Sequence, residues 1–327
     1  MYEPSSHIIQ VGNWSFNEIQ INDKDLFNNY IQKTSYPCNL WSTNFAYLWA
    51  ISQSNLRTIL WKIVDNMLVT FDYSYKGTLY LYCLPFGKGG AEKVLDVLIK
   101  CMQYCLDFNK QDKEKSTLRM INEAQLEFLK KSSRFDKYFR LVTWRGIERH
   151  YDVKKLLLLA GKEFANVRGC VNKFHKDNPN AIICRYERKD YDELITLDDK
   201  WKQTSGKKYS NIFDGVYYKE LIKHCEDLNQ IILIIKIDGE IVGMISGCEL
   251  SDKQAWGSVV KFAAGIPGLS ETLIIEFVKE INTINSKIEL LNVGSDLGSG
   301  GLREYKLKFR PVLNFKRYQV FFKDNTH

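Results

Sequence analysis

Two stretches of this sequence carry the same order of secondary-structure signals, and that repetition limits the folds open to the chain. Each has β-rich runs joined by tight turns, then a glycine-rich turn, and then a helix with one apolar stripe. The first stretch comprises runs and turns at 57–64, Asp65-Asn66, 67–75, Lys76-Gly77 and 78–86, then Pro85 to Gly90 and a helix over 91–106.

The second stretch repeats this order further along the chain. Its elements are 230–237, Asp238-Gly239, 240–250, 255–263, Gly265 to Gly268 and a helix from about Ser270. Asp-Gly between β-rich runs is a strong hairpin signal, and Ser270 is a suitable N-cap. The repetition predicts a duplicated α/β unit, with domains at 1–150 and 151–327.

The remaining elements are expected around these two stretches. The pattern predicts helices or helical turns at 25–32, 41–51, 123–132, 152–174, 190–204, 214–228 and 300–306, and strands at 116–122, 137–144, 181–187, 287–294 and within 308–322. If 305–310 is extended, Lys306, Lys308 and Arg310 share one face of a strand.

Composition indicates a folded chain with a sizeable core, because 45% of the residues are hydrophobic and 13% are aromatic. The formal charge of +7 names no partner by itself. No secretory signal and no stretch of about 20 apolar residues is found. The 8 cysteines include no C-x-x-C pair, so reduced thiols and a cytoplasmic location are expected.

The glycine turn after 255–263 has a functional and a structural interpretation. Backbone N–H groups at such a turn, together with the positive end of the helix dipole, can bind phosphate. Lys261, Gly265 and Gly268 resemble the pyrophosphate loop of the N-acetyltransferase-like (GNAT) fold, although the usual glycines are displaced. Alternatively, the glycines only turn the chain into the helix, and we favour this structural reading for Pro85 to Gly90.

Two further stretches resemble the family of phosphatidylglycerol lysyltransferase C-terminal domains. They are Tyr151-Asp152 through Gly161-Lys162, Arg168 and Asn172-Lys173-Phe174, and Asn292 through Asp296-Leu297-Gly298, Gly301-Leu302-Arg303, Lys306 and Pro311. This resemblance implies two tandem GNAT-like units, each a mixed, mostly antiparallel sheet flanked by helices, akin to the Fem-type peptidoglycan aminoacyltransferases. Its membrane members move lysine from lysyl-tRNA to phosphatidylglycerol, and this chain resembles the stand-alone members.

The resemblance implies a transferase whose donor is aminoacyl-tRNA or acyl-CoA and whose acceptor is an amine or a hydroxyl. Asp296 is the candidate base or ammonium-binding carboxylate, although capping of the following turn is an equal alternative. Lys306 and Tyr305 complete the catalytic candidates, and Tyr305 would donate a proton to the leaving group. The candidate binding residues are Lys162, Arg168, Asn172, Lys173, Lys261, Gly265, Gly268 and Arg303, and no metal site is expected.

Two basic stretches, 154–176 and 303–323, are expected to form a phosphate cleft if the fold brings them together. Such a cleft would suit tRNA, coenzyme A or a phospholipid headgroup at a membrane surface; the oligomeric state is left open. Departures from the family pattern occur at Glu163, Val167, Gly169, Val260, Gly294 and Ser295. A binding module that keeps the fold without the chemistry is therefore the alternative function.

Overall fold

The computed structural model describes residues 7–204, 206 and 214–324. The chain forms two compact units, one made of Met1–Arg145 with Phe315–His327 and the other of Gly146–Asn314. The expected domains 1–150 and 151–327 remain a prediction, and this division differs from them because 146–150 group with the second unit and the last segment, from Phe315, with the first. The C-terminal strand belongs to the first unit because it pairs there with two strands of that unit's sheet.

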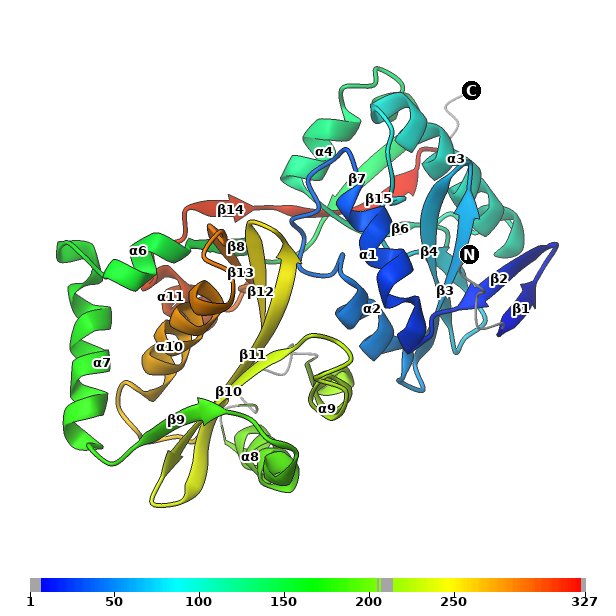
Figure 1. The fold of residues 1–327 in the computed structure, drawn as a ribbon. Helices are drawn as coiled ribbons and strands as arrows, with labels where there is room; N and C mark the ends of the chain where they lie inside the picture. Colours follow the sequence, from blue (N-terminus) through cyan, green and yellow to red (C-terminus); the bar gives the residue numbers. More distant parts are fainter. Residues whose placement is uncertain (1–6, 205, 207–213, 325–327) are drawn as a thin grey trace. The chain divides into compact units, whose positions relative to one another are not determined.

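The first unit is built on an eight-stranded sheet in the order β1-β2-β3-β4-β5-β6-β15-β7 (Figure 1). Its neighbouring strands are antiparallel except for the pair β5 and β6. The elements are β1 (Ile8–Val11), β2 (Trp14–Glu18), α1 (Lys24–Gln32), α2 (Phe45–Ser52), β3 (Arg57–Val64), β4 (Met67–Ser74), β5 (Leu79–Leu81), α3 (Ala91–Phe108), β6 (Leu118–Asn122), α4 (Glu123–Leu129), α5 (Phe135–Tyr138), β7 (Phe139–Thr143) and β15 (Arg317–Phe322).

The second unit holds a seven-stranded sheet in the order β14-β8-β13-β12-β11-β10-β9. Its parallel pair is β12 and β13. The elements are β8 (Glu148–Asp152), α6 (Val153–Leu158), α7 (Ala165–Asp177), β9 (Ile182–Arg185), α8 (Tyr191–Gln203), α9 (Tyr218–Lys223), β10 (Ile231–Ile237), β11 (Glu240–Ser251), β12 (Gln254–Phe262), α10 (Leu269–Ile284), β13 (Leu290–Ser295), α11 (Gly300–Leu307) and β14 (Leu313–Phe315), with short 3-10 helices at Lys162–Phe164 and Asp214–Val216.

The two units confirm the expected duplication. In each, a hairpin leads to a third strand, a long helix and a strand parallel to the third: β3-β4-β5-α3-β6 and β10-β11-β12-α10-β13. The hairpin turns have the left-handed conformation expected for them, with φ of 49° and 64° at Asp65 and Asn66 and of 51° and 88° at Asp238 and Gly239.

A strand from the far half of the chain follows the parallel pair in each sheet. β15, the last strand of the chain, lies between β6 and β7, and β8, which follows β7 in sequence, lies beside β13. The chain therefore passes from the first sheet into the second after β7 and returns after β14. Local sequence patterns could not predict this exchange.

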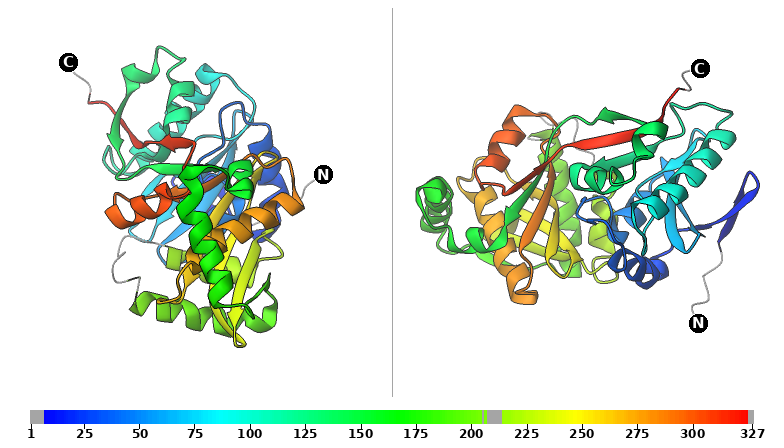
Figure 2. Two further views of the ribbon diagram at one scale, coloured as in Figure 1. Left: turned by 90° about the vertical axis from the view of Figure 1, so that its left-hand side faces the viewer. Right: turned by 90° about the horizontal axis from the view of Figure 1, so that it is seen from above.

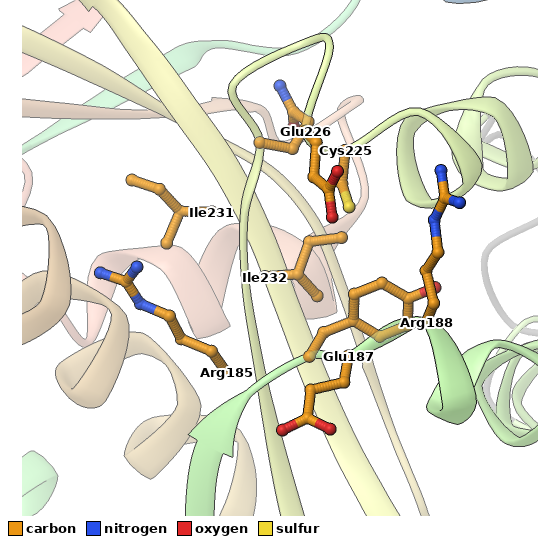
Figure 3. A pocket seen from close by; sticks show the side chains of 9 residues that line it. Arg185, Glu187, Arg188, Cys225, Glu226, Ile231 and Ile232 are labelled. Atoms are coloured by element: carbon orange, nitrogen blue, oxygen red, sulfur yellow. The ribbon is translucent and has the colours of Figure 1, made fainter.

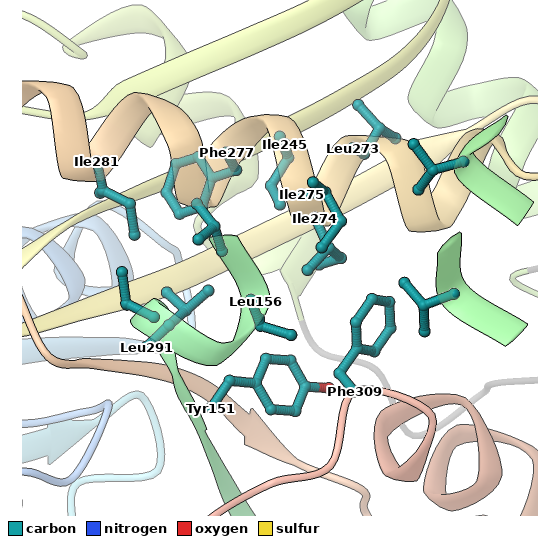
Figure 4. Close-up of a cluster of buried hydrophobic side chains, with 14 of the residues drawn as sticks. Tyr151, Leu156, Ile245, Leu273, Ile274, Ile275, Phe277, Ile281, Leu291 and Phe309 are labelled. Atoms are coloured by element: carbon teal, nitrogen blue, oxygen red, sulfur yellow. The ribbon is translucent and has the colours of Figure 1, made fainter. Parts of the chain in front are cut away.

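Helices cover both faces of the second sheet. α10 packs against β10, β11 and β12 on one face and also contacts α7, which crosses it, whereas α8 packs on the other face (Figures 1 and 2). Leu273 and Phe277 of α10 meet Ile245, Leu291 and Tyr151 in a buried cluster (Figure 4). Each such side chain contributes about 1.5–3 kcal/mol through burial, so this core fixes α10 on the sheet.

The helical turn expected at 300–306 is confirmed, whereas the alternative of an extended 305–310 is wrong. Residues 300–307 form α11, so Lys306, Lys308 and Arg310 do not share the face of a strand. Lys306 lies on the buried side of the helix, whereas Lys308 and Arg310 are exposed. The spacing of so few basic residues does not distinguish one face of a strand from a short helix. In the structure a helix begins at Gly300 and Gly301.

Candidate functional site

Two parallel strands separate near the middle of the second sheet. β12 and β13 pair only through Gln254 to Trp256 on one strand and Leu290 to Asn292 on the other. β12 continues to Phe262 beside β11, and β13 continues to Ser295 beside β8, but beyond Trp256 and Asn292 the two strands show no pairing with each other in the described residues. On this part of β13 the carbonyls of Val293 and Ser295 accept from Nζ of Lys306, and the N–H of Gly294 donates to Oδ1 of Asn292, so side chains replace the lost backbone pairing there.

Asp296 follows directly on the separated end of β13, and its carboxylate is fully engaged. Oδ1 accepts hydrogen bonds from the backbone N–H groups of Ile147 and Gly298, both at 3.0 Å. Oδ2 lies 2.8 Å from Nη2 of Arg149 in a buried ion pair. The side chain of Asp296 is fully buried, so this arrangement caps the turn before α11.

The surroundings of Asp296 keep it ionised. Burial acts to raise its pKa, but the hydrogen bonds from Arg149, Ile147 and Gly298 outweigh burial and lower the pKa below the usual value. A carboxylate with a lowered pKa is a weak general base near neutral pH. Its chemistry favours holding cations, and Nε of Arg303 lies 3.7 Å from Oδ2.

Arg303 is the expected site residue that this arrangement leaves accessible. It lies in α11 with its side chain 51% exposed, while its Nε faces Asp296. A guanidinium oriented from behind by a buried carboxylate presents its remaining donors outward. The structure thus brings Asp296 and Arg303 together, as expected, at the end of β13.

Lys306 and Tyr305 form bonds within the unit. Nζ of Lys306 donates to the backbone carbonyls of Val293 and Ser295, so it ties α11 to the separated end of β13. Tyr305 points toward α10, where its hydroxyl donates to the carbonyl of Ser270 at 3.1 Å. Burial raises the pKa of Tyr305 far above its usual value, which disfavours loss of its proton.

The glycine loop before α10 is shaped by packing. Gly268 has a φ of 77°, and a Cβ at this position would lie 2.1 Å from the carbonyl oxygen of Cys170 in α7. Only glycine therefore allows α7 to approach the start of α10. Gly265 also has a positive φ, of 87°, but faces open space. The first turn of α10 holds Glu271, whose carboxylate accepts from Nζ of Lys308 at 3.1 Å.

Lys261 lies away from this loop, on the α8 side of the sheet. Its fully buried Nζ is 3.2 Å from Asp198 and 2.9 Å from Asp214, and it stands 3.4 Å from the ring centroid of Trp201. Two carboxylates and an aromatic face already satisfy its charge. In this position Lys261 does not reach a phosphate at the start of α10, contrary to the expected role.

The expected residues between 154 and 176 divide into bonded and exposed ones. Arg168 donates to the carbonyls of Leu159 and Gly161, and so closes the C-terminal end of α6. Lys162 and Asn172 are exposed, as is Lys173, which pairs with Asp177 at 2.8 Å. These exposed side chains are free to approach a large ligand but are not gathered around Arg303 by any contact that the structure shows.

The two basic stretches do meet, at a groove of about 300 Å³. It is lined by Glu163, Asn166, Glu304, Leu307, Lys308 and Arg310. Nε of Arg310 donates to the carbonyl of Glu163 at 3.1 Å, which joins the stretches directly. Two glutamates balance the lysine and the arginine, so the groove is mixed in charge rather than a basic cleft.

Sequence reasoning missed two charged residues of β8, Glu148 and Arg149. Glu148 and Arg149 are buried in this strand, and Arg149 supplies the partner of Asp296. His150, the next residue of this strand, is fully buried, and burial lowers its pKa to about 4. The run Glu-Arg-His has no apolar alternation, so its only signal was its position before the Tyr151-Asp152 motif.

A second hollow, of about 220 Å³, lies at the β9 edge of the same sheet (Figure 3). Arg185, Glu187, Arg188, Cys225 and Glu226 are among its lining residues. None of the expected site residues lies there. Burial raises the pKa of Cys225, so this thiol is not an activated nucleophile.

Comparison with known proteins gives the same fold. A conserved protein of unknown function from Bacteroides thetaiotaomicron has a TM-score of 0.78 at 22% identity, with 94% of this chain and 99% of that chain covered. L-PGS from Bacillus licheniformis has a TM-score of 0.62 at 15% identity, with 93% of each chain covered. A tandem GNAT protein from the clavulanic acid biosynthesis pathway has a TM-score of 0.53 at 9% identity and covers 94% and 98%.

These likenesses show that the chain consists of two tandem GNAT-like units. A search of curated proteins finds no match. The family described as phosphatidylglycerol lysyltransferase, C-terminal, matches residues 42–321, which is most of the sequence. The match covers both units and every expected site residue, and it shows that the chain belongs to the phosphatidylglycerol lysyltransferase C-terminal family.

Proposed function

We propose that this protein is an acyl- or aminoacyltransferase with its site in the second unit, where β12 and β13 separate. Membership of a transferase family and the GNAT-like fold support a transferase-like function. The observation that carries the proposal is the end of pairing after Trp256 and Asn292, on the strand that leads into Asp296, which the guanidinium of Arg303 faces. The donor is an aminoacyl-tRNA or an acyl-CoA, and the acceptor is an amine or a hydroxyl.

The reaction is a single acyl transfer. The acceptor nitrogen or oxygen attacks the acyl carbonyl carbon, a new C–N or C–O bond forms, and the C–O bond to tRNA or the C–S bond to coenzyme A breaks. The acceptor loses one proton, and the departing oxygen or sulfur gains one. Arg303 would stabilise negative charge on the carbonyl oxygen or the donor phosphate, while Asp296 and Lys306 act as positioning residues.

Donor consumption tests this proposal. The full chain is incubated separately with labelled aminoacyl-tRNA and with labelled acyl-CoA, each with a panel of amines and hydroxyl-bearing lipids. We expect faster loss of one donor than in buffer. Arg303→Met, which keeps the stem and removes the charge, should lower kcat/KM at least about tenfold, a change of about 1.4 kcal/mol.

Arg185→Met is the matched control for that experiment. Arg185 is also an exposed arginine of the second unit, but its partner is Glu280 and it lies on the far edge strand β9. Its rate should equal that of the unaltered chain. No consumption of either donor by folded protein, or equal rates for Arg303→Met and the unaltered chain, would refute the proposal.

The second candidate is a binding module without turnover. It is favoured by the engagement of Asp296, Lys306 and Tyr305, since each already forms bonds within the unit. Under this alternative, tRNA or coenzyme A binds and is recovered unmodified. The affinity for tRNA should then fall steeply as salt rises, because binding relies on phosphate contacts.

A further inference from the structure

The first unit has its own cluster of charged and aromatic side chains, on one face of its sheet. Asp72 on β4 lies directly opposite Tyr80 on β5, so both point to the same face. Leu81 pairs with Leu118, which places the next residue of β6, Arg119, on the face shared by Tyr80 and Tyr82. We call Arg57, Asp72, Tyr80, Tyr82 and Arg119 the Arg119 cluster.

Arg119 is held by ring contacts and keeps most of its hydrogen-bonding capacity. Its guanidinium carbon lies 5.9 Å from the ring centroid of Tyr82 and 5.7 Å from that of Trp144. Within residues 7–204, 206 and 214–324, its guanidinium makes one hydrogen bond, a long one of 3.5 Å to the hydroxyl of Tyr80. A guanidinium has five N–H donors, so several are available to a ligand.

Asp72 is the complementary acceptor. Its Oδ2 accepts from Nη1 of Arg57 at 2.6 Å and from the hydroxyl of Tyr80 at 2.7 Å. Its Oδ1 is buried and has no hydrogen-bond partner in the part of the chain that the structure describes. A buried carboxylate oxygen without a donor is unfavourable, because charged groups lose more free energy on desolvation than neutral ones. This oxygen is therefore suited to a donor brought by a ligand.

The cluster carries an excess of positive charge and is open to solvent. Two guanidinium groups face one carboxylate, and burial raises the pKa of Tyr80 to about 12, so this phenol stays neutral. The side chain of Arg57 is 21% exposed, and Tyr80 and Arg119 are also partly exposed. Tyr80 links Asp72 to Arg119 within the cluster, since its hydroxyl contacts both side chains.

We propose that the Arg119 cluster binds an oxyanion that also carries a hydrogen-bond donor. Arg119 and Arg57 would receive the oxyanion, and Asp72 Oδ1 would accept the donor. Inorganic phosphate meets this requirement through its P–OH group, and an α-amino acid meets it through its ammonium group beside the carboxylate. The proposal does not depend on transferase activity, because the cluster lies in the first unit.

Two matched pairs of small ligands test the proposal with the full chain. Calorimetric titration at pH 7 compares inorganic phosphate with sulfate, which has no proton to donate, and glycine with acetate, which lacks the ammonium. We expect the donor-bearing member of one pair to bind at least about tenfold more tightly than its partner. The pair that shows this preference identifies the source of the oxyanion.

Substitutions locate the binding. Arg119→Lys keeps the charge but removes the planar fork, so it should weaken binding at least about tenfold. Asp72→Asn should abolish the preference for the donor-bearing ligand. Arg140→Lys is the control. Arg140 is a partly exposed arginine of the same unit, lies on β7 and pairs with Glu114.

Three results would overturn the proposal. The first is that neither phosphate nor glycine binds to the folded chain at millimolar concentration. The second is equal affinity for both members of each pair. The third is unchanged binding in Arg119→Lys, which remains informative even if Asp72→Asn fails to fold.

Discussion

The buried pair of Asp296 and Arg149 shows how one residue can decide what its neighbours do. Asp296 is fully buried, and only 10% of the Arg149 side chain is exposed, so each charge depends on the other. Asp296 also receives two backbone N–H groups and faces Arg303. Loss of either partner should therefore affect both stability and the orientation of Arg303.

Arg149→Met is expected to destabilise the protein by about 3–5 kcal/mol, because it leaves a buried carboxylate without its cation. The free energy of unfolding in urea measures this change. Arg185→Met, which removes one partner of an exposed pair with Glu280, should cost at most about 1 kcal/mol. Equal costs for the two variants would contradict the described environment of Asp296.

His150 should make stability depend on pH. Its pKa is lowered by burial to about 4 in the folded chain, whereas the unfolded imidazole titrates near 6.5. The unfolded state therefore binds the proton first as pH falls. The stabilising contribution is complete above pH 6.5 and is lost progressively down to about pH 4, a total of about 3 kcal/mol.

Unfolding free energies at pH 7, 5.5 and 4.5 test this dependence. His150→Gln removes the titrating group while keeping a polar side chain, so the fall in stability between pH 7 and 4.5 should be smaller in this variant. Identical slopes for the variant and the unaltered chain would show that His150 does not titrate as described. Other groups with shifted pKa values contribute equally to both curves.

The motifs predicted which residues lie near one another in the site better than they predicted the hydrogen bonds and ion pairs of those residues. The spacing of Asp296, Arg303 and Lys306 placed them together, and the structure confirms that proximity. Arg149 was missed because a buried charged strand has no apolar alternation. Lys261 was expected at a phosphate, but its charge is held by the carboxylates of Asp198 and Asp214. These partners lie far away in sequence, so the pairing could not be foreseen.

At the level of elements, hydrophobic patterns predicted strands and helices well where residues typical of turns or helix caps flank the pattern. The hairpin at Asp238-Gly239 and the helix α10 follow the sequence closely. β1 and β2 were missed, since their short alternating segments lie in a polar start. The helical turn expected at 300–306 agrees with α11, whereas an extended 305–310 is wrong because the helix continues to Leu307.

Gly268 should be the more sensitive glycine of its loop. Gly268→Ala places a Cβ 2.1 Å from the carbonyl oxygen of Cys170, so α7 must shift away from α10. We expect a lower Tm, corresponding to at least about 2 kcal/mol. Gly265→Ala is the matched control with a similar positive φ but open space, and it should cost about 1–2 kcal/mol.

Thermal unfolding of the two alanine variants measures the difference. The cost of Gly268→Ala should exceed that of Gly265→Ala, because only the former adds a steric clash to backbone strain. If Gly265→Ala is the more destabilising, the loop is held by its turn rather than by α7. The phosphate-loop interpretation would then regain support.

At the scale of the whole chain, the return of the last strand to the first unit has a direct consequence. β15 pairs with both β6 and β7, and Phe322 packs on Phe139. A chain that ends at Asn314 would leave two open strand edges in the first sheet. We expect strong destabilisation of the first unit and a smaller effect on the second.

Amide hydrogen exchange of the truncated chain reports each unit separately. Protection should be lost in 118–122 and 139–143 and largely kept in 231–262. Retained protection of β6 and β7 would contradict the described strand order. The place of β15 beside β6 was not predictable from the sequence, because pairing between residues 122 and 317 leaves no local pattern.

The described helices include none long and apolar enough to cross a bilayer.

The central claim is that the second unit binds the donor where β12 and β13 separate, and hydrogen exchange with a non-reactive donor analogue tests it most directly. The analogues are an amide-linked aminoacyl-tRNA 3′ fragment and an acyl-CoA thioether. The account predicts new protection in 255–262 and 290–296 with one analogue; binding without protection of either segment would contradict it.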